Sequence, residues 1–299
     1  MSDRDSKIGV LLVGHGTASE VGTRQFLALA GQLTERVAPL PVEPAFLEMR
    51  QPDIAAGLCR LIERGAAHHL AVPLLLFGAG HAKRDIPAAV YNAIRTLLAE
   101  AFSRQPEPSR IAKAQWSGRN AFFLASQADH LGCHRAMVEL SRQRYREAVA
   151  GLSPVPPEQT ALVLVGRGSR NESATAEMHE FAQLRHQPAV EGDIFVSFLA
   201  MTQPSLAEML PLVAARRFRR VVVQPHLLFE GDLAENIRRA VSEIQSQHPD
   251  QEWLITPLLA DGLETRPTAQ DSPLRGNELL LRVLEDRIQA AIVAAGVGD

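Results

Sequence analysis

Residues 10–20 read VLLVGHGTASE, and residues 162–172 read LVLVGRGSRNE. In both stretches an apolar run ends at a Gly-X-Gly turn, and small or polar residues then lead into a helical pattern. Gly166 stands 152 positions after Gly14. A short apolar run that stops at a glycine turn is typical of a buried strand followed by a helix. This stretch therefore predicts a βα unit that the chain uses twice.

The same spacing recurs at two further places along the chain. FLEMRQPDI, which starts at Phe46, matches FLAMTQPSL, which starts at Phe198. VPLLLF, which starts at Val72, matches QPHLLF, which starts at Gln224. Both pairs are again 152 positions apart, and repeated matches at one spacing indicate an internal duplication.

Each half alternates short apolar runs with amphipathic patterns, which predicts parallel βαβ units. In the first half we expect strands at 8–13, 42–47, 69–76 and 119–125, and helices at 20–37, 53–64, 84–103 and 134–150. In the second half we expect helices at 174–185, 205–216, 232–247 and 277–294. The proline-rich segment VAGLSPVPPEQT is the expected linker. We therefore expect an α/β protein with two similar domains, residues 1–152 and 160–299, each a parallel four-stranded sheet flanked by helices.

Composition narrows the functional classes. The chain has 299 residues, of which 46% are hydrophobic and 22% charged, so it can fill two ordinary cores. A net charge of -3 gives no overall attraction to nucleic acid or to anionic membranes. Cys59 and Cys133 show no CxxC spacing, which favours a reducing compartment. The start MSDRDSK is no secretory signal and no apolar stretch reaches membrane length, so we expect a cytoplasmic protein.

Parallel sheets of this kind bind ligands in the loops at the carboxyl ends of their strands. In the first half, the loops after the first three strands hold His15, Glu48 and His81. The equivalent positions of the second half, with one residue deleted after its third strand, hold Arg167, Ala200 and Asp232. The surrounding glycines and prolines are the same in both halves, which indicates a site that only the first half retains.

Two imidazoles and a carboxylate form a ligand set suited to Fe²⁺, Co²⁺, Ni²⁺ or Zn²⁺, and three ligands leave coordination positions open. Taken singly, His15, Glu48 and His81 each read more simply as loop or surface residues, and only their joint loss from the second half favours a shared site. His68 and His69 precede the third strand and are interpreted as structural.

Another cluster occurs in ADHLGCHRAM, where His130 and His134 flank Cys133. This grouping could indicate a metal cluster. Entry into a helix is the simpler interpretation.

The segments LLVGHGT, PAFLE and VPLLLFGAGHAKRDIP together resemble the class II chelatases that insert cobalt or iron into sirohydrochlorin in cobalamin and siroheme synthesis. The resemblance covers nearly the whole chain and is to the long, two-domain form. It implies two chelatase-like domains, with His15, His81 and Glu48 as the metal-binding and catalytic residues. It also implies a second domain without the histidines that helps to form the cleft.

The resemblance implies sirohydrochlorin and a divalent metal as partners, with the metal as substrate and no permanently bound cofactor. Cobalt is favoured over iron. A carboxylate-rich tetrapyrrole requires local positive charge. The candidates for this role, each of which alone reads as a solvated surface cation, are Arg50, Lys83, Arg84, Arg167 and Arg170.

We expect His15 and His81 to present the metal and to accept pyrrole protons, with Glu48 as third ligand or proton relay. A metal or tetrapyrrole carrier that does not insert the metal is the alternative function, and a purely structural duplication is a further one. A histidine phosphatase would require arginine before the histidine, where this chain has Gly14. The oligomeric state stays open, although two domains in one chain could replace a homodimer. Residues 264–277 are expected to form a lid or a flexible loop.

Overall fold

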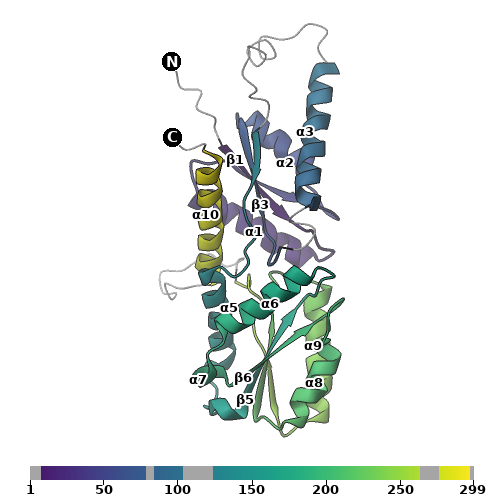
Figure 1. The fold of residues 1–299 in the computed structure, drawn as a ribbon, viewed down its shortest axis with the longest axis vertical. Helices are drawn as coiled ribbons and strands as arrows, with labels where there is room; N and C mark the ends of the chain where they lie inside the picture. The colour runs from purple at the N-terminus through teal and green to yellow at the C-terminus, as the bar shows by residue number, and fades with distance from the viewer. Residues whose placement is uncertain (1–7, 79–83, 104–123, 263–275, 297–299) are drawn as a thin grey trace.

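The computed structural model describes residues 8–78, 84–103, 124–262 and 276–296. In these ranges, two α/β halves follow one another along the long axis of the molecule (Figure 1). The sequence-based predictions for His81, Lys83, the start of the fourth strand and residues 264–275 fall outside the described residues. None of the described helices combines the length and the apolar composition that crossing a membrane requires.

The first sheet is parallel and has the strand order β2-β1-β3-β4. Its strands are β1 (Ile8–Gly14), β2 (Val42–Phe46), β3 (His68–Pro73) and β4 (Leu124–Gln127). Every residue of β1 is buried, as expected of a central parallel strand that has helices on both faces. One face packs against α2 (Ile54–Glu63) and α3 (Ile86–Ser103), and the other against α1 (Glu20–Arg36) and α10 (Gly276–Ala295).

The second sheet repeats this order as β6-β5-β7-β8, and all its strands are parallel. Its strands are β5 (Thr160–Gly166), β6 (Asp193–Phe198), β7 (Arg220–Pro225) and β8 (Glu252–Ile255). Its helices are α5 (Arg135–Val149), α6 (Glu172–Arg185), α7 (Pro188–Glu191), α8 (Leu206–Ala215) and α9 (Asp232–Gln247). A 3₁₀ turn, η2 (Pro157–Gln159), lies in the linker. Two parallel four-stranded sheets flanked by helices confirm the predicted fold class.

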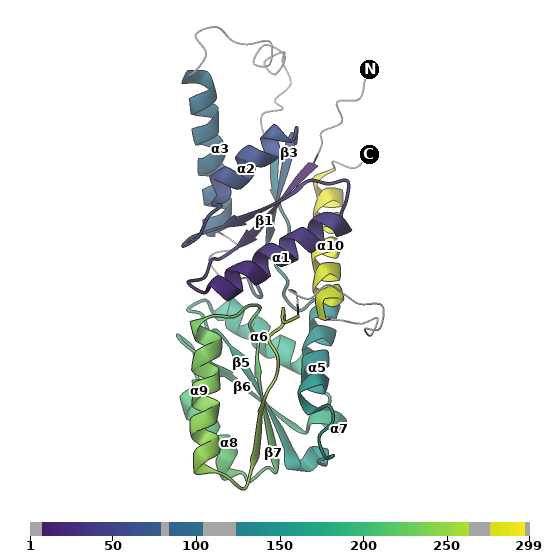
Figure 2. The same ribbon diagram turned by 180° about the vertical axis from the view of Figure 1, so that it is seen from behind.

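Two helices are exchanged between the halves of the sequence. Tyr145 on α5 packs against Leu162 and Val222 of the second sheet, although α5 belongs to the first half of the sequence. The C-terminal helix α10 packs instead on β3, β4 and α1 of the first half. Figure 2 shows α10 beside the first sheet and α5 beside the second. Each sheet is therefore covered partly by a helix from the other half of the sequence.

The helices that follow the first two strands of each half begin at equivalent side-chain caps. Ser19 and Asn171 cap α1 and α6, where the side-chain oxygen of each accepts a backbone N–H. Asp53 and Ser205 cap α2 and α8 in the same way, and Ser205 does so within a full capping box. These caps satisfy backbone donors that the first helical turn leaves unpaired, so they stabilise the start of each helix after its strand.

A histidine lies in the core between the halves. His226 follows β7 and is 1% exposed, and its ring stacks on Phe77 with the centroids 5.0 Å apart. The ring of Phe181 lies 4.3 Å away on the same centroid measure. Among the described residues, neither ring nitrogen of His226 has a hydrogen-bond partner. Burial, with a contribution from Arg185, lowers the pKa of His226 to about 3.

Replacing His226 with leucine should make the protein less sensitive to acid. Position 74, the equivalent in the first half, already carries leucine. Below pH 6.5 the imidazole binds a proton in the unfolded chain but not in the native one. The free energy of unfolding therefore decreases as the pH is lowered from 6.5 to the native pKa of about 3. Because of His226, the free energy of unfolding of the wild type should be about 2 kcal/mol lower at pH 5 than at pH 7. Chemical denaturation at both pH values measures the difference, and an equal loss in wild type and His226→Leu would contradict the prediction.

Candidate functional site

The loops after β1 and β2 meet at the carboxyl edge of the first sheet. From the central strand β1 the chain passes to β2 on one side, and it then returns to β3 on the other side of β1. This reversal of strand order is where open parallel sheets bind their ligands. The amide of Leu47 donates to the Gly14 carbonyl at 2.9 Å, and the amide of Glu48 donates to the His15 carbonyl at 3.1 Å. These backbone bonds place His15 beside Glu48.

A glycine in each half makes this meeting of loops possible. Gly16 has a φ of 107°, and a Cβ on it would lie 2.0 Å from the Glu48 carbonyl oxygen. Gly168 has a φ of 85°, and its Cβ would lie 1.7 Å from the Ala200 carbonyl oxygen. Both positions therefore require glycine for backbone reasons alone. The repeated glycines belong to the fold, whereas the residues beside them are free to differ.

The side chains of His15 and Glu48 are in direct contact. His15 Nδ1 lies 3.3 Å from Glu48 Oε1, and the two side chains are 22% and 53% exposed. A carboxylate at one ring nitrogen fixes the orientation of an imidazole, an arrangement common among metal-binding histidines. The equivalent residues of the second half, Arg167 and Ala200, cannot form such a pair. The structure thus brings together two of the three predicted ligands, and His81 lies outside the described residues.

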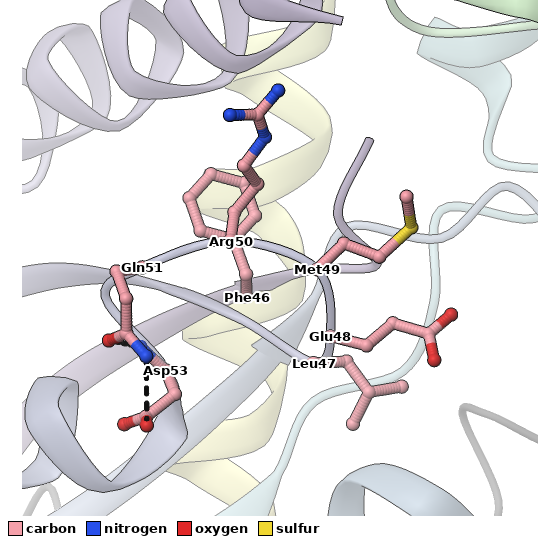
Figure 3. A pocket seen from close by; sticks show the side chains of 7 residues that line it. All are labelled: Phe46, Leu47, Glu48, Met49, Arg50, Gln51 and Asp53. Atoms are coloured by element: carbon pink, nitrogen blue, oxygen red, sulfur yellow. Dashed lines mark hydrogen bonds between the residues drawn. The ribbon is translucent and has the colours of Figure 1, made fainter. Parts of the chain in front are cut away.

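Glu48 lines a pocket of about 400 Å³ whose walls come from residues 46–53 (Figure 3). Met49 has a φ of 66° and is 64% exposed at the pocket. Arg50 points away from Glu48 (Figure 3). The pocket therefore presents the carboxylates of Glu48 and Asp53 and the thioether of Met49, with Glu48 next to the turn that carries His15.

Arg50 holds the turn after β1. Its Nε donates to the Thr17 carbonyl at 2.7 Å, its Nη1 contacts Glu20 Oε1 at 2.6 Å, and its Nη2 donates to the Ala18 carbonyl. In the second half the equivalent Thr202 exchanges two hydrogen bonds with the backbone of Ser169. Both halves therefore tie the second loop to the first at this position, a role that sequence inspection does not reveal.

The structure describes three of the other four cationic residues predicted to bind the substrate. Arg84, Arg167 and Arg170 are exposed, and Arg167 directly follows β5 at the position of His15. Lys83 lies outside the described residues. An exposed guanidinium at the end of a central strand can reach an anionic ligand without first breaking a buried contact.

The other histidines have structural contacts. His134 is the N-cap of α5, and its Nδ1 accepts the Ala136 amide at 3.2 Å, which confirms helix entry as its role. His68 is buried at the opposite edge of the sheet, with Nε2 2.8 Å from Ser126 Oγ. Within the ranges that the structure describes, no group of three or more His, Cys, Asp or Glu side chains is arranged to hold a metal ion. The proposed three-ligand set includes His81 and so is not assembled among those residues.

Two curated relatives of this chain are sirohydrochlorin chelatases. A sirohydrochlorin cobaltochelatase of Priestia megaterium is 26% identical over 247 residues, which cover 82% of this chain and 72% of the relative. A sirohydrochlorin ferrochelatase of the same organism is 27% identical over 256 residues, which cover 85% of each chain. The chain thus has relatives named for either metal.

Solved structures share the fold. SirB from Bacillus subtilis with Fe³⁺ has a TM-score of 0.73 at 22% identity, over 97% of this chain and 98% of that one. The sirohydrochlorin chelatase SirB from Bacillus subtilis subspecies spizizenii in complex with cobalt has a TM-score of 0.66 at 22% identity, over 95% of each chain. The CbiX family model matches residues 9–148 and again residues 161–291, which confirms the duplication. The chain therefore belongs to the CbiX family and carries the family's domain twice.

Proposed function

We propose that this protein is a sirohydrochlorin chelatase, which inserts a divalent metal ion into the tetrapyrrole. The observation that carries the proposal is the contact between His15 and Glu48 at the carboxyl edge of the first sheet, which the second half lacks. The names of the relatives, which include a cobaltochelatase and a ferrochelatase of sirohydrochlorin, support the same reaction. The proposal includes the cytoplasmic location expected from the sequence.

Metal insertion requires that pyrrole nitrogens lose their protons while the metal exchanges its water for those nitrogens. An imidazole can bind a divalent ion or accept a proton near neutral pH, because its unperturbed pKa is about 6.5. In the proposal, His15 and His81 present the metal and accept protons. Glu48 orients the His15 ring and acts as third ligand or passes the proton onward. The metal is a substrate, because an open ligand set can release it to the macrocycle.

The proposal favours cobalt as the metal, with iron as the alternative. Nitrogen and oxygen ligands of intermediate hardness accept both ions, and supply in the cell decides much of the loading. The carboxylates of sirohydrochlorin are assigned to Arg84, Arg167, Arg170 and Lys83. Arg50 acts on the same site through the turn after β1, which its guanidinium holds.

The first test is an anaerobic absorbance time course of sirohydrochlorin with Co²⁺ or Fe²⁺. Wild type should accelerate metal insertion over the protein-free control, and His15→Ala and His81→Ala should each lose about a hundredfold or more of that rate. His248→Ala, which changes a histidine at the end of α9, is the control and should retain the wild-type rate. A wild-type rate equal to that of the protein-free control with both metals would reject the chelatase and favour the carrier.

A matched glycine pair tests whether the turn builds the metal site. Gly16→Ala and Gly168→Ala should each lower the free energy of unfolding by about 2 kcal/mol or more, because each added Cβ meets a backbone carbonyl. Only Gly16→Ala should also weaken Co²⁺ binding, since it separates His15 from Glu48. Calorimetric titration with Co²⁺ measures the affinity, and an equal loss of affinity in both variants would contradict the assignment of the metal to the first half.

The charge of Arg167 should act on substrate binding. Arg167→Ala should raise KM for sirohydrochlorin by about three- to tenfold with little change in kcat, as expected for an exposed ionic contact. The effect should shrink at high salt, because exposed charges are screened. Arg216→Ala, at the end of α8, is the control with unchanged KM. An unchanged KM in Arg167→Ala at low salt would remove this residue from the site.

A further inference from the structure

The two halves of the molecule are fastened to each other by a pair of equivalent side chains. Gln25 on α1 and Glu177 on α6 stand 152 positions apart, the spacing of the internal repeat. Both helices lie at the boundary between the halves in the two opposite views (Figures 1 and 2). Each side chain makes its contacts in the half that does not carry it.

Glu177 reaches the loop that follows β3 of the first half. Its Oε2 accepts the backbone N–H of Gly78 at 2.9 Å, and its Oε1 lies 2.6 Å from His130 Nε2. The thiol of Cys133 donates to the Glu177 carbonyl at 3.6 Å. Gly78 is the third residue before His81 in the sequence. A side chain from the second half therefore fixes the backbone at the point where the chain leads to the predicted metal ligand.

Gln25 makes the mirror contact on the second half. Its Oε1 accepts the backbone N–H of Glu230 at 2.9 Å, and Glu230 is the repeat equivalent of Gly78. Its Nε2 donates to Asp261 Oδ1 at 3.4 Å. The first helix of each half thus holds the third loop of the other half at the same position.

Backbone bonds support each of these contacts from the opposite side. Gly132 donates to the Leu76 carbonyl at 2.8 Å, and the equivalent Ala260 donates to the Leu228 carbonyl at 3.0 Å. In both halves, the loop after the fourth strand thus donates a backbone hydrogen bond to the segment that follows the third strand. The side chains of Glu177 and Gln25 then accept the backbone amides two residues further on, those of Gly78 and Glu230.

The two contacts differ in chemistry. Glu177 pairs with His130, whose other ring nitrogen lies 2.8 Å from Asp129 Oδ1. A Cβ on Gly78 would come within 2.9 Å of the His130 ring, so the glycine lets the imidazole pack against this backbone. A carboxylate forms stronger hydrogen bonds than a neutral amide oxygen does. The stronger contact therefore holds the loop of the half that carries the candidate metal site.

We propose that Glu177, held by His130, is a positioning residue for metal insertion: from the opposite half of the chain it fixes the backbone of Gly78, three residues before His81. This inference rests on the proposed function. It gives the second half, which lacks the metal ligands, a defined task in the reaction. Because Glu177 acts through the Gly78 backbone, its loss should change the reaction geometry more than substrate binding.

The test compares the two equivalent contacts. Glu177→Ala should lower kcat for Co²⁺ insertion about tenfold or more, with KM for sirohydrochlorin changed less than about twofold. It should also weaken Co²⁺ binding and speed hydrogen exchange at the Gly78 amide. Glu177→Gln keeps an acceptor for that amide and should recover most of the rate. Gln25→Ala removes the equivalent contact and should lower the melting temperature while kcat stays near the wild-type value.

Glu180→Ala, an exposed change one turn along α6, controls for the helix itself and should behave as wild type. Equal losses of kcat in Glu177→Ala and Gln25→Ala would show a merely structural role and overturn the inference. Unchanged Co²⁺ affinity in Glu177→Ala would also overturn it. Co²⁺ binding is measured without sirohydrochlorin, so a wild type that binds Co²⁺ but inserts neither Co²⁺ nor Fe²⁺ rejects the proposed function while the affinities still decide the inference. A wild type that binds neither Co²⁺ nor Fe²⁺ overturns both.

Discussion

The backbone of the turn after the first strand touches the backbone of the turn after the second strand, and a glycine in each half makes this contact possible. At Gly16 and Gly168 there is no space for a Cβ, since the neighbouring carbonyl oxygen already occupies it. The residue before each glycine is therefore always placed beside the residue two positions after the second strand. In the first half this geometry joins His15 to Glu48. The second half keeps the geometry with other side chains, so the scaffold and the chemistry are separable.

The halves share a continuous interior. One cluster of buried apolar residues includes Val10 and Leu70 of the first sheet, Leu164 of the second sheet and Leu284 of α10. The exchanged helices α5 and α10 and the contacts of Gln25 and Glu177 cross the same boundary. Removal of either half would expose apolar surface and leave the amides of Gly78 or Glu230 without their side-chain acceptors. A second half without metal ligands thus has a physical reason to remain.

The second half contains a buried ion pair, formed by Arg185 and Glu191. Arg185, which is fully buried, pairs with Glu191 at 3.1 Å, and burial lowers the pKa of Arg185 to about 10. Its guanidinium also lies over the ring of Tyr145 on the exchanged helix α5. Breaking such a pair by removing one partner is costly, because an uncompensated charge remains in the interior. The pair therefore links α6 and α7 under the helix that the first half of the sequence contributes.

The sequence alone determined the duplication, the fold class and the nearness of His15 and Glu48. These features follow from apolar runs, glycine turns, the repeat spacing and the rule that ligands gather at the carboxyl ends of parallel strands. Only the tertiary structure decided that α5 and α10 change places, that Arg50 holds a turn, and that Glu177 reaches Gly78. Those contacts join residues far apart in the chain, and they depend on which surface each helix covers. Periodicity shows that a helix has an apolar face, but it does not show which sheet that face will meet.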